Sequence, residues 1–284
     1  MSQGGWITRR RLLWAGLCTL AGGAGLGYYT CRIEPHWIEW VRRDLPVSGL
    51  PEHLQGATLV QLSDLHVGPQ VDDDYIRHAL AQVTALEPDF VVYTGDFMTS
   101  AGAERLSQVG RTLAELPLGR RGTAAILGNH DSGYNWKMVE VADRLTRLLG
   151  DLGATVLRNQ SVTFDGLHLV GLEDYWGPNW NVSAALDTLP RGPAIALCHN
   201  PDGAEKKGWD RYQGWILSGH THGGQCKAPF FRPPVCPVEN KRFIAGEYDL
   251  GSDRQVYINR GLGHIVQARF NARPEITLFR LIAS

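Results

Sequence analysis

In the first half of the chain, short apolar runs alternate with longer stretches in which apolar residues recur at helical spacing. Strands are predicted at residues 57–62, 90–93 and 123–127. Helices are predicted between and after them, at residues 73–86, 103–116 and 136–149. Alternation of strand and helix is typical of a parallel α/β sheet, in which ligands bind at the carboxyl ends of the strands.

The second half of the chain is richer in strands. They are predicted at residues 155–157, 162–164, 167–170, 194–198, 215–217, 255–258 and 276–281. This two-phase pattern fits two mixed sheets packed face to face, with helices on their outer faces. Because no internal repeat or linker interrupts the pattern, we expect residues 57–284 to form one domain.

The first 31 residues have the pattern of an export segment. Residues 12–31 carry no charge and directly follow three arginines, which is the order of a charged start and an apolar stretch in signal sequences. The string Thr8-Arg9-Arg10-Arg11-Leu12-Leu13 resembles a twin-arginine signal. Five glycines dilute the apolar stretch, as is typical of such signals. We therefore expect residues 1–31 to be a twin-arginine-like signal or a membrane anchor, with the twin-arginine export machinery as a partner.

Residues 32–56 are expected to be a membrane-proximal linker. They include an amphipathic stretch from Glu34 to Arg43 that could lie at the membrane surface. The arginines before the apolar stretch place the N-terminus inside, which predicts an exported domain that is periplasmic or membrane-associated. The alternative is an inner-membrane anchor with a cytoplasmic domain, because Arg32, Arg42 and Arg43 flank the other end.

The composition is that of an ordinary globular protein. Hydrophobic residues make up 43% and charged residues 20% of the 284 residues, so intrinsic disorder is excluded. The 28 basic and 29 acidic side chains nearly balance, and no nucleic acid is indicated as a partner. Five cysteines do not make a disulfide framework in a chain this long. Cys226 and Cys236 could pair in an oxidising compartment, and Cys198 is expected to be buried.

Five polar clusters each follow an apolar run directly. They are Asp64-Leu65-His66, Gly95-Asp96, Gly128-Asn129-His130-Asp131, His199-Asn200 and Gly219-His220-Thr221-His222-Gly223. Each cluster alone would be explained as a cap or a turn. Together they combine five of the ten histidines with carboxylate and amide oxygens, which are ligands suited to Mn²⁺, Fe or Zn²⁺. Asp96 could bridge two cations, because a carboxylate has two oxygens.

This ordered set of clusters resembles the calcineurin-like metallophosphoesterases. The resemblance implies a four-layer α/β/β/α sandwich with two mixed sheets, whose catalytic domain is residues 57–284. It also implies two divalent metal ions, Mn²⁺ first and Fe or Zn²⁺ as alternatives, and a hydroxide between them that attacks phosphorus. His130 would stabilise the transition state or protonate the leaving oxygen. The implied ligands are Asp64, His66 and His222 for one metal and Asn129, His199 and His220 for the other, with Asp96 bridging.

One position departs from the family pattern. Many members have a second Asp three residues after the bridging one, where it orients the catalytic His. Here that position is Thr99, so the orientation of His130 is left open. Asp131 is a weaker candidate for the same role as His130, with the alternative that it only fixes the turn.

Other features resemble the YkuE/YaeI-type exported phosphodiesterases of this family, whose relatives include UDP-2,3-diacylglucosamine pyrophosphohydrolases of lipid A biosynthesis. They are the arginine leader, residues 34–37, 198–202, 219–225 and 259–263, and Arg273-Pro274-Glu275. The resemblance implies hydrolysis of a phosphodiester or a lipid pyrophosphate such as UDP-2,3-diacylglucosamine at a membrane surface. Arg260 and Arg269 are candidates for gripping a substrate phosphate.

Three other interpretations are open. A non-catalytic scaffold with this fold would have lost metal ligands, and a broad-specificity exported phosphatase would keep them. A cysteine hydrolase built on Cys198 and His199 is disfavoured, because adjacent residues of a strand point to opposite faces. Four aromatic residues either form an apolar rim for acyl chains or pack their loops onto the body: Trp176, Trp180, Phe230 and Phe231.

Overall fold

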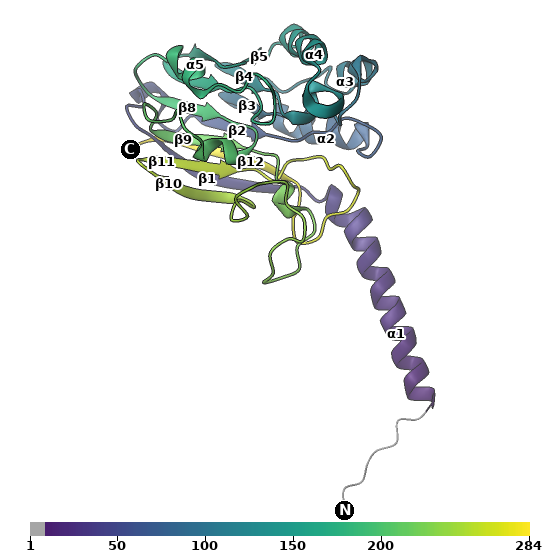
Figure 1. Ribbon diagram of the computed structural model, residues 1–284. Helices are drawn as coiled ribbons and strands as arrows, with labels where there is room; N and C mark the ends of the chain where they lie inside the picture. Colours follow the sequence, from purple (N-terminus) through teal and green to yellow (C-terminus); the bar gives the residue numbers. More distant parts are fainter. Residues whose placement is uncertain (1–8) are drawn as a thin grey trace, which may run out of the picture.

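The computed structural model describes residues 9–284 (Figure 1). Helix α1 (Arg9–Tyr28) extends away from the folded body and continues into a π-helical turn, Tyr29–Ile33. Within the described residues, no helix is both long enough and apolar enough to cross a membrane. Thr8, the first residue of the twin-arginine-like string, lies outside the described residues, and the export segment stays a prediction.

The first sheet has six strands. In spatial order they are β1 (Glu39–Val47), β12 (Glu275–Ala283), β2 (Thr58–Leu62), β3 (Phe90–Thr94), β4 (Gly122–Ile126) and β5 (Thr155–Val156). Strands β2 to β5 are parallel, and β12 is antiparallel to β2, so the sheet is mixed. The apolar runs of the sequence predicted all of these strands except β1.

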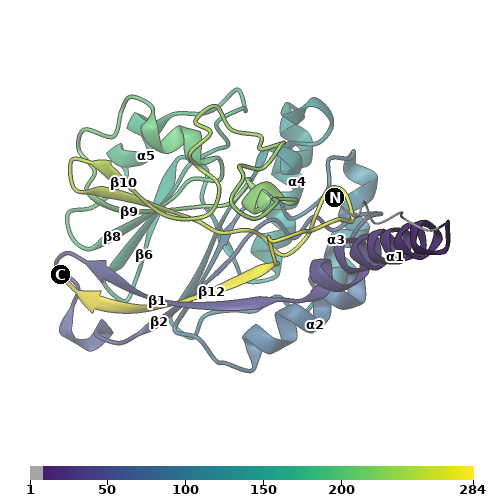
Figure 2. The same cartoon turned by 90° about the horizontal axis from the view of Figure 1, so that it is seen from below.

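Residues 39–47, which the sequence placed in a membrane-proximal linker, form the edge strand β1 instead. This strand pairs in parallel with β12 along its whole length, from Glu39↔Glu275 to Val47↔Ala283 (Figure 2). Leu45 and Val47 are buried, whereas Arg42 and Arg43 are exposed. An edge strand has one unpaired side and tolerates such charges, and for that reason its sequence lacks an apolar run.

The second sheet also has six strands and is mixed. In spatial order they are β10 (Gly246–Gly251), β11 (Arg254–Ile258), β9 (Gly214–Ser218), β8 (Ala194–Leu197), β7 (Leu167–Gly171) and β6 (Gln160–Phe164). The four central strands are parallel, and the edge strands β6 and β10 are antiparallel to their neighbours. Strand β10 was not predicted, because its residues alternate between half-buried and exposed and form no apolar run.

The two sheets pack face to face with cover on both outer faces, as the resemblance implied. Leu59 of the first sheet and Leu197 of the second belong to the apolar core between the sheets. The outer face of the first sheet is covered by α2 (Asp73–Thr84), α3 (Leu106–Thr112) and α4 (Val139–Asp151). The outer face of the second sheet is covered by a short helix, α5 (Val182–Asp187), and by irregular segments.

Two helices begin three residues later than the sequence predicted. Helix α3 begins at Leu106 and ends at Thr112, because the preceding residues form a separate 3₁₀ turn, Ala103–Arg105. Helix α4 begins at Val139 rather than at Trp136. Asn135 and Trp136 have φ angles of 57° and 59°, which a right-handed helix cannot contain.

Candidate metal centre

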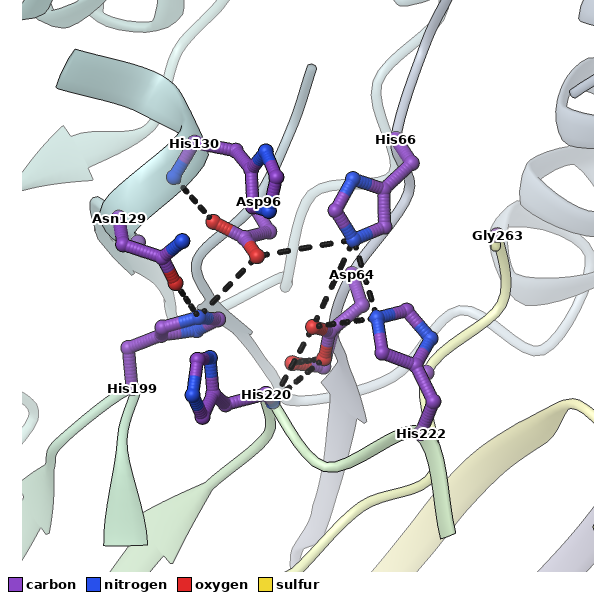
Figure 3. Close-up of polar contacts among 12 residues, drawn as sticks. Asp64, His66, Asp96, Asn129, His130, His199, His220, His222 and Gly263 are labelled. Carbon is purple, nitrogen blue, oxygen red and sulfur yellow. Dashed lines mark hydrogen bonds and ion pairs between the residues drawn. The ribbon is translucent and has the colours of Figure 1, made fainter. Parts of the chain in front are cut away.

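The polar clusters of the sequence meet at one end of the two sheets. Asp64 and His66 follow β2, and Asp96 follows β3. The remaining residues follow β4, β8 and β9, so every cluster lies at the carboxyl end of its strand. Figure 3 shows the side chains pointing toward one another. Seven of them are buried: Asp64, His66, Asp96, Asn129, His199, His220 and His222.

The first group is formed by Asp64, His66 and His222, whose nitrogen and oxygen atoms lie within 4.8 Å of one another. Nε2 of His222 lies 3.1 Å from Nε2 of His66 and 3.5 Å from Oδ1 of Asp64. The Asp64 carboxylate is oriented by hydrogen bonds from the Ser63 hydroxyl and from the backbone N–H of His220. Two imidazole nitrogens and a carboxylate oxygen therefore converge at one place, and this donor set suits a divalent cation.

The second group is formed by Asp96, His199 and His220. Nδ1 of His199 donates to the Thr94 carbonyl at 2.7 Å, so Nε2 faces the group. It lies 3.2 Å from Oδ2 of Asp96 and 3.2 Å from Oδ1 of Asn129. The acceptor atoms of three side chains thus meet here.

The ring of His220 is held by a partner outside the group. Its Nε2 donates to the Pro237 carbonyl at 2.8 Å. Nδ1 is therefore the nitrogen that is left for a metal. A hydrogen bond that fixes the orientation of a ligand ring in this way is typical of metal sites.

Asp96 lies between the two groups. Its Oδ2 is 3.5 Å from Nε2 of His66 and 3.2 Å from Nε2 of His199. Its Oδ1 accepts the backbone N–H of His130 at 2.9 Å, which fixes the carboxylate. One oxygen atom is thus shared by both groups.

The electrostatics of the site favour bound cations. Burial lowers the pKa of His66 and of His220 to about 3, so both imidazoles are neutral, which is the form that binds a metal. Burial alone would also lower the pKa of His199, but the carboxylate of Asp96 raises it well above its usual value. The buried carboxylates therefore draw positive charge into the site, and the residues present fit two divalent cations.

Backbone strain is concentrated at the same residues. Five of them have left-handed φ angles: Asp64 (51°), His66 (49°), Asp96 (56°), His220 (70°) and His222 (51°). Residues other than Gly rarely adopt these φ angles, and residues that do so cluster at functional sites. Gly128 must lack a side chain, because a Cβ there would overlap the Asp96 carboxylate. The chain is thus bent to aim these side chains inward.

His130 is half-buried beside these groups, with its ring 5.0 Å from that of His66. Its Nδ1 lies 2.7 Å from Oγ of Ser100 and 3.2 Å from the backbone nitrogen of the same residue. Thr99, at the departing position, instead donates to the His66 carbonyl. Ser100 is therefore the partner of His130 that the sequence did not indicate. The available signal was a hydroxyl residue four positions after Asp96.

Asp131 fixes the turn after β4. Its two carboxylate oxygens accept the backbone N–H groups of Met98 and Gly128. These contacts tie the loop after β3 to the turn after β4. Asp131 thereby holds the turn that carries Asn129 and His130.

The two arginines proposed for substrate contact are not free for it. The fully buried guanidinium of Arg269 donates to the backbone carbonyls of Arg260, Gly261, Gly263 and Ala272. The guanidinium of Arg260 pairs with the carboxylates of Glu39 and Glu275. Both side chains hold the C-terminal segment together, and the structure offers neither to a phosphate.

The aromatic residues proposed as a rim separate into two kinds. Trp176 packs against His220, with ring centroids 4.6 Å apart, and Trp180 packs against the apolar core of the second sheet. Phe230 and Phe231, in contrast, are exposed. Trp176 and Trp180 therefore pack their loop onto the body, while the two phenylalanines remain open to contact.

The cysteines form no disulfide: Cys226 and Cys236 are both free. Cys198 is buried in the apolar core on the outer face of the second sheet, and burial raises the pKa of its thiol well above the usual value. A buried neutral thiol is not a nucleophile. The cysteine-hydrolase interpretation has no support at this residue.

Two mixed sheets with this set of side chains at their strand ends define a metal-dependent phosphoesterase. The family described as calcineurin-like phosphoesterase matches residues 57–224, and the chain belongs to this family. It is a metal-dependent phosphoric ester hydrolase of a family that uses a dinuclear divalent metal site.

Curated relatives extend the similarity over most of the chain. Phosphodiesterase YaeI of Escherichia coli (strain K12) is 34% identical over 97% of this chain and 100% of its own length. The metallophosphoesterase YkuE of Bacillus subtilis (strain 168) is 34% identical over 94% of this chain and 92% of its own. The UDP-2,3-diacylglucosamine pyrophosphatase LpxG of Chlamydia muridarum (strain MoPn / Nigg) is 29% identical over 88% of this chain and 91% of its own.

Proposed function

We propose that this protein hydrolyses a phosphodiester or a pyrophosphate with two divalent metal ions, of which Mn²⁺ is the first candidate. The observation that carries the proposal is the position of Asp96 Oδ2, 3.5 Å from His66 Nε2 and 3.2 Å from His199 Nε2. One carboxylate oxygen shared by two ligand groups is the arrangement that a two-metal site requires.

Each side chain then has a defined part. When bound, the two cations supply Lewis-acid activation of a water molecule and of the phosphoryl group. Asp96 would hold both cations, and His130 would contribute a hydrogen bond at the edge of the site. The other ligands would be Asp64, His66 and His222 for one cation and Asn129, His199 and His220 for the other.

The relatives support a diester or a pyrophosphate rather than a monoester, since two of them are named a phosphodiesterase and a pyrophosphatase. We propose further that the substrate is lipid-linked, with UDP-2,3-diacylglucosamine as the first compound to test, and that the enzyme acts at a membrane surface. A feature of the described surface supports this second step.

An apolar loop surface lies beside the end of α1. Phe230, Phe231 and Val235 are exposed on one loop, and Ile265 and Val266 are exposed on a second. Figure 1 shows both loops on the side of the body from which α1 extends. Exposed aromatic and aliphatic side chains gathered at loop tips are typical of a membrane or protein contact.

This apolar loop surface is joined to the metal centre and to the N-terminal segment. The side chain of Gln225 donates to the Val266 carbonyl at 2.7 Å, and the backbone of Gln225 bonds to that of His222. The backbone N–H of Arg269 donates to the Thr30 carbonyl at 2.9 Å. Arg232, which is exposed next to Phe231, would favour anionic headgroups. A lipid bound at these loops would therefore lie next to the backbone of His222, one of the proposed metal ligands.

Hydrolysis by the full chain tests the chemistry. The metal-stripped protein is re-supplied with Mn²⁺ and assayed on bis-p-nitrophenyl phosphate, p-nitrophenyl phosphate and UDP-2,3-diacylglucosamine. We expect turnover of the diester and of the UDP-lipid, and none after treatment with a chelator. Metal-independent turnover, or activity on the monoester alone, would contradict the proposal.

Sedimentation with vesicles of phosphatidylcholine and phosphatidylglycerol tests the surface. Replacing Phe230 and Phe231 with Ser should reduce binding at least about 100-fold, since each exposed ring contributes about 1.5–3 kcal/mol when buried in the interface. Leu86→Ser removes an exposed apolar side chain elsewhere on the body and is the matched control. Equal binding of all three proteins would remove the apolar loop surface from the proposal.

We also propose that the N-terminal segment directs export. Replacing Arg9 and Arg10 with Lys should then block delivery of the protein across the membrane, which fractionation measures. Unchanged delivery would refute the twin-arginine signal. Recovery of the wild-type protein on the inner side of the membrane would favour the anchor with an internal domain, and with it the UDP-lipid, because nucleotide-linked lipids are made inside the cell.

A further inference from the structure

Two tryptophans, Trp136 and Trp176, form a pair beside the metal centre. Trp176, from the loop after β7, packs nearly perpendicular to the ring of His220, with ring centroids 4.6 Å apart. Trp136, from the loop after β4, lies against Trp176, with centroids 4.9 Å apart and an angle of 31° between the ring planes. The Trp136 ring is also 6.3 Å from that of His130. The tryptophan pair therefore reaches from one proposed metal ligand to His130.

The backbone holds Trp136 in an unusual conformation. Trp136 and Asn135 have left-handed φ angles of 59° and 57°, and Gly133 has a φ angle of 68°. Bulky residues seldom adopt such angles, and residues held in them cluster at functional sites. The Trp136 side chain nevertheless stays 37% exposed. A strained residue that keeps a large ring open to solvent beside the metal centre indicates a ligand for that ring.

The neighbours of Trp136 suit a nucleoside better than an acyl chain. Asn135 and Lys137, on either side of it in the chain, are both exposed. An amide group can bond to the polar edge of a base, and an ammonium group attracts phosphate. An acyl chain at the same place would remove water from both polar side chains without replacing it. The apolar loop surface, in contrast, offers the side chains that an acyl chain needs.

We propose that Trp136 is a specificity-determining residue whose ring stacks against the base of a nucleoside phosphate, with Trp176 supporting it. The inference rests on the proposed function and deepens it, because it assigns residues to one end of the substrate and so orients the whole molecule. Figure 3 shows His130 and His222 on opposite sides of the group of ligands. The nucleoside lies on the side of His130, and a lipid lies at the apolar loop surface, on the side of His222.

The size of the effect follows from the stacking of a base on an aromatic side chain. Such a contact contributes about 1–3 kcal/mol, which is about 5- to 150-fold in a binding constant. The base lies away from the reacting phosphorus, so the contact is the same in the ground state and in the transition state. Loss of the Trp136 ring should therefore raise KM of a nucleotide substrate and leave kcat unchanged.

The test compares two phosphate monoesters that differ in the base alone, uridine 5′-monophosphate and ribose 5-phosphate. Each is used as a competitive inhibitor of the turnover of bis-p-nitrophenyl phosphate by the full chain with Mn²⁺. The wild-type protein should bind the nucleotide at least about fivefold more tightly than the sugar phosphate, as the two inhibition constants measure.

Three variants separate stacking from a general structural effect. Trp136→Ala should bring the two inhibition constants within about twofold of each other, by weakening the nucleotide alone. Trp136→Phe keeps an aromatic ring and should retain most of the preference. Trp14→Ala is the matched control, because Trp14 is exposed on α1, which extends away from the body. This control should keep the wild-type preference.

The outcomes distinguish the inference from the proposed function. Equal inhibition constants in a wild-type protein that hydrolyses the diester would overturn the inference and leave the proposed function standing. An active Trp136→Ala variant with an unchanged preference would do the same, and so would an equal loss of preference in Trp14→Ala. Absence of diester turnover by the wild-type protein would overturn the proposed function, together with the inference.

Discussion

Replacing Asp96 with Asn tests the shared carboxylate most directly. Asn keeps the shape of the side chain and an acceptor for the backbone N–H of His130, but it places an amide group or a neutral oxygen where Oδ2 faces His66 and His199. The change therefore removes a negative charge at the point where two ligand groups meet, with little change in packing.

The expected magnitude follows from Coulomb's law. At an effective dielectric constant of about 20, two unit charges about 4 Å apart interact with about 4 kcal/mol. Loss of about 4 kcal/mol corresponds to about a 1000-fold lower rate, since 1.36 kcal/mol is a factor of ten, and the double charge of each cation makes this a lower bound. Loss of a cation from the site would lower the rate further.

The assay measures kcat with bis-p-nitrophenyl phosphate and the metal content of the same protein by mass spectrometry. Asp89→Asn is the matched control, because Asp89 precedes β3 and Asp96 follows it, at the opposite end of the strand. The control should lose stability, since Asp89 accepts from Thr58, but should keep its kcat. An Asp96→Asn variant with normal metal content and a rate within tenfold of wild type would refute the bridging assignment.

Three further predictions concern residues that support the fold around the first sheet and the metal centre. Arg269→Met should lower the free energy of unfolding by about 3 kcal/mol in urea denaturation, because buried carbonyls lose their donor, and should leave KM for the diester unchanged. Gly95→Ala should abolish activity and lower stability, because φ is +93° and a Cβ would lie 2.8 Å from Nδ1 of His199; normal kinetics would contradict this. Burial alone would raise the pKa of Asp89, but hydrogen bonds from Thr58 hold it below its usual value, so the carboxylate stabilises the fold above the unfolded pKa of about 3.9. The stability difference between wild type and Asp89→Asn should therefore shrink as the pH falls from 5 to 2, as urea midpoints would show.

The sequence predicted the strands that carry the site because they are buried on both faces. Strands β2, β3 and β4 lie between helices and the second sheet, so most of their residues are apolar and stand out as short runs. The polar residues that follow each run were therefore easy to find. Their convergence could be predicted, because parallel strands bring their carboxyl ends to one edge.

The contacts that the sequence missed depend on chain segments far apart or on unusual backbone angles. Strand β1 is stabilised by β12, more than 230 positions along the chain. The charged residues within β1 interrupt any apolar run, so the sequence pattern does not predict a strand there. From its residue type alone, Arg269 was expected to bind an anion. Its guanidinium instead donates hydrogen bonds to four backbone carbonyls of its own loop. Ser100 reaches His130 only because the loops after β3 and β4 fold together.

The pairing of β1 with β12 also determines when the fold can form. β12 follows β1 by more than 230 residues and lies between β1 and β2, so β1 has no neighbour in this sheet until residues 275–283 have been synthesised. Contacts of such sequence separation form late and slow folding. During synthesis, the segment carrying α1 is therefore exposed while the first sheet is still open at the position of β12. A protein truncated before residue 275 would lack the strand that joins its two ends.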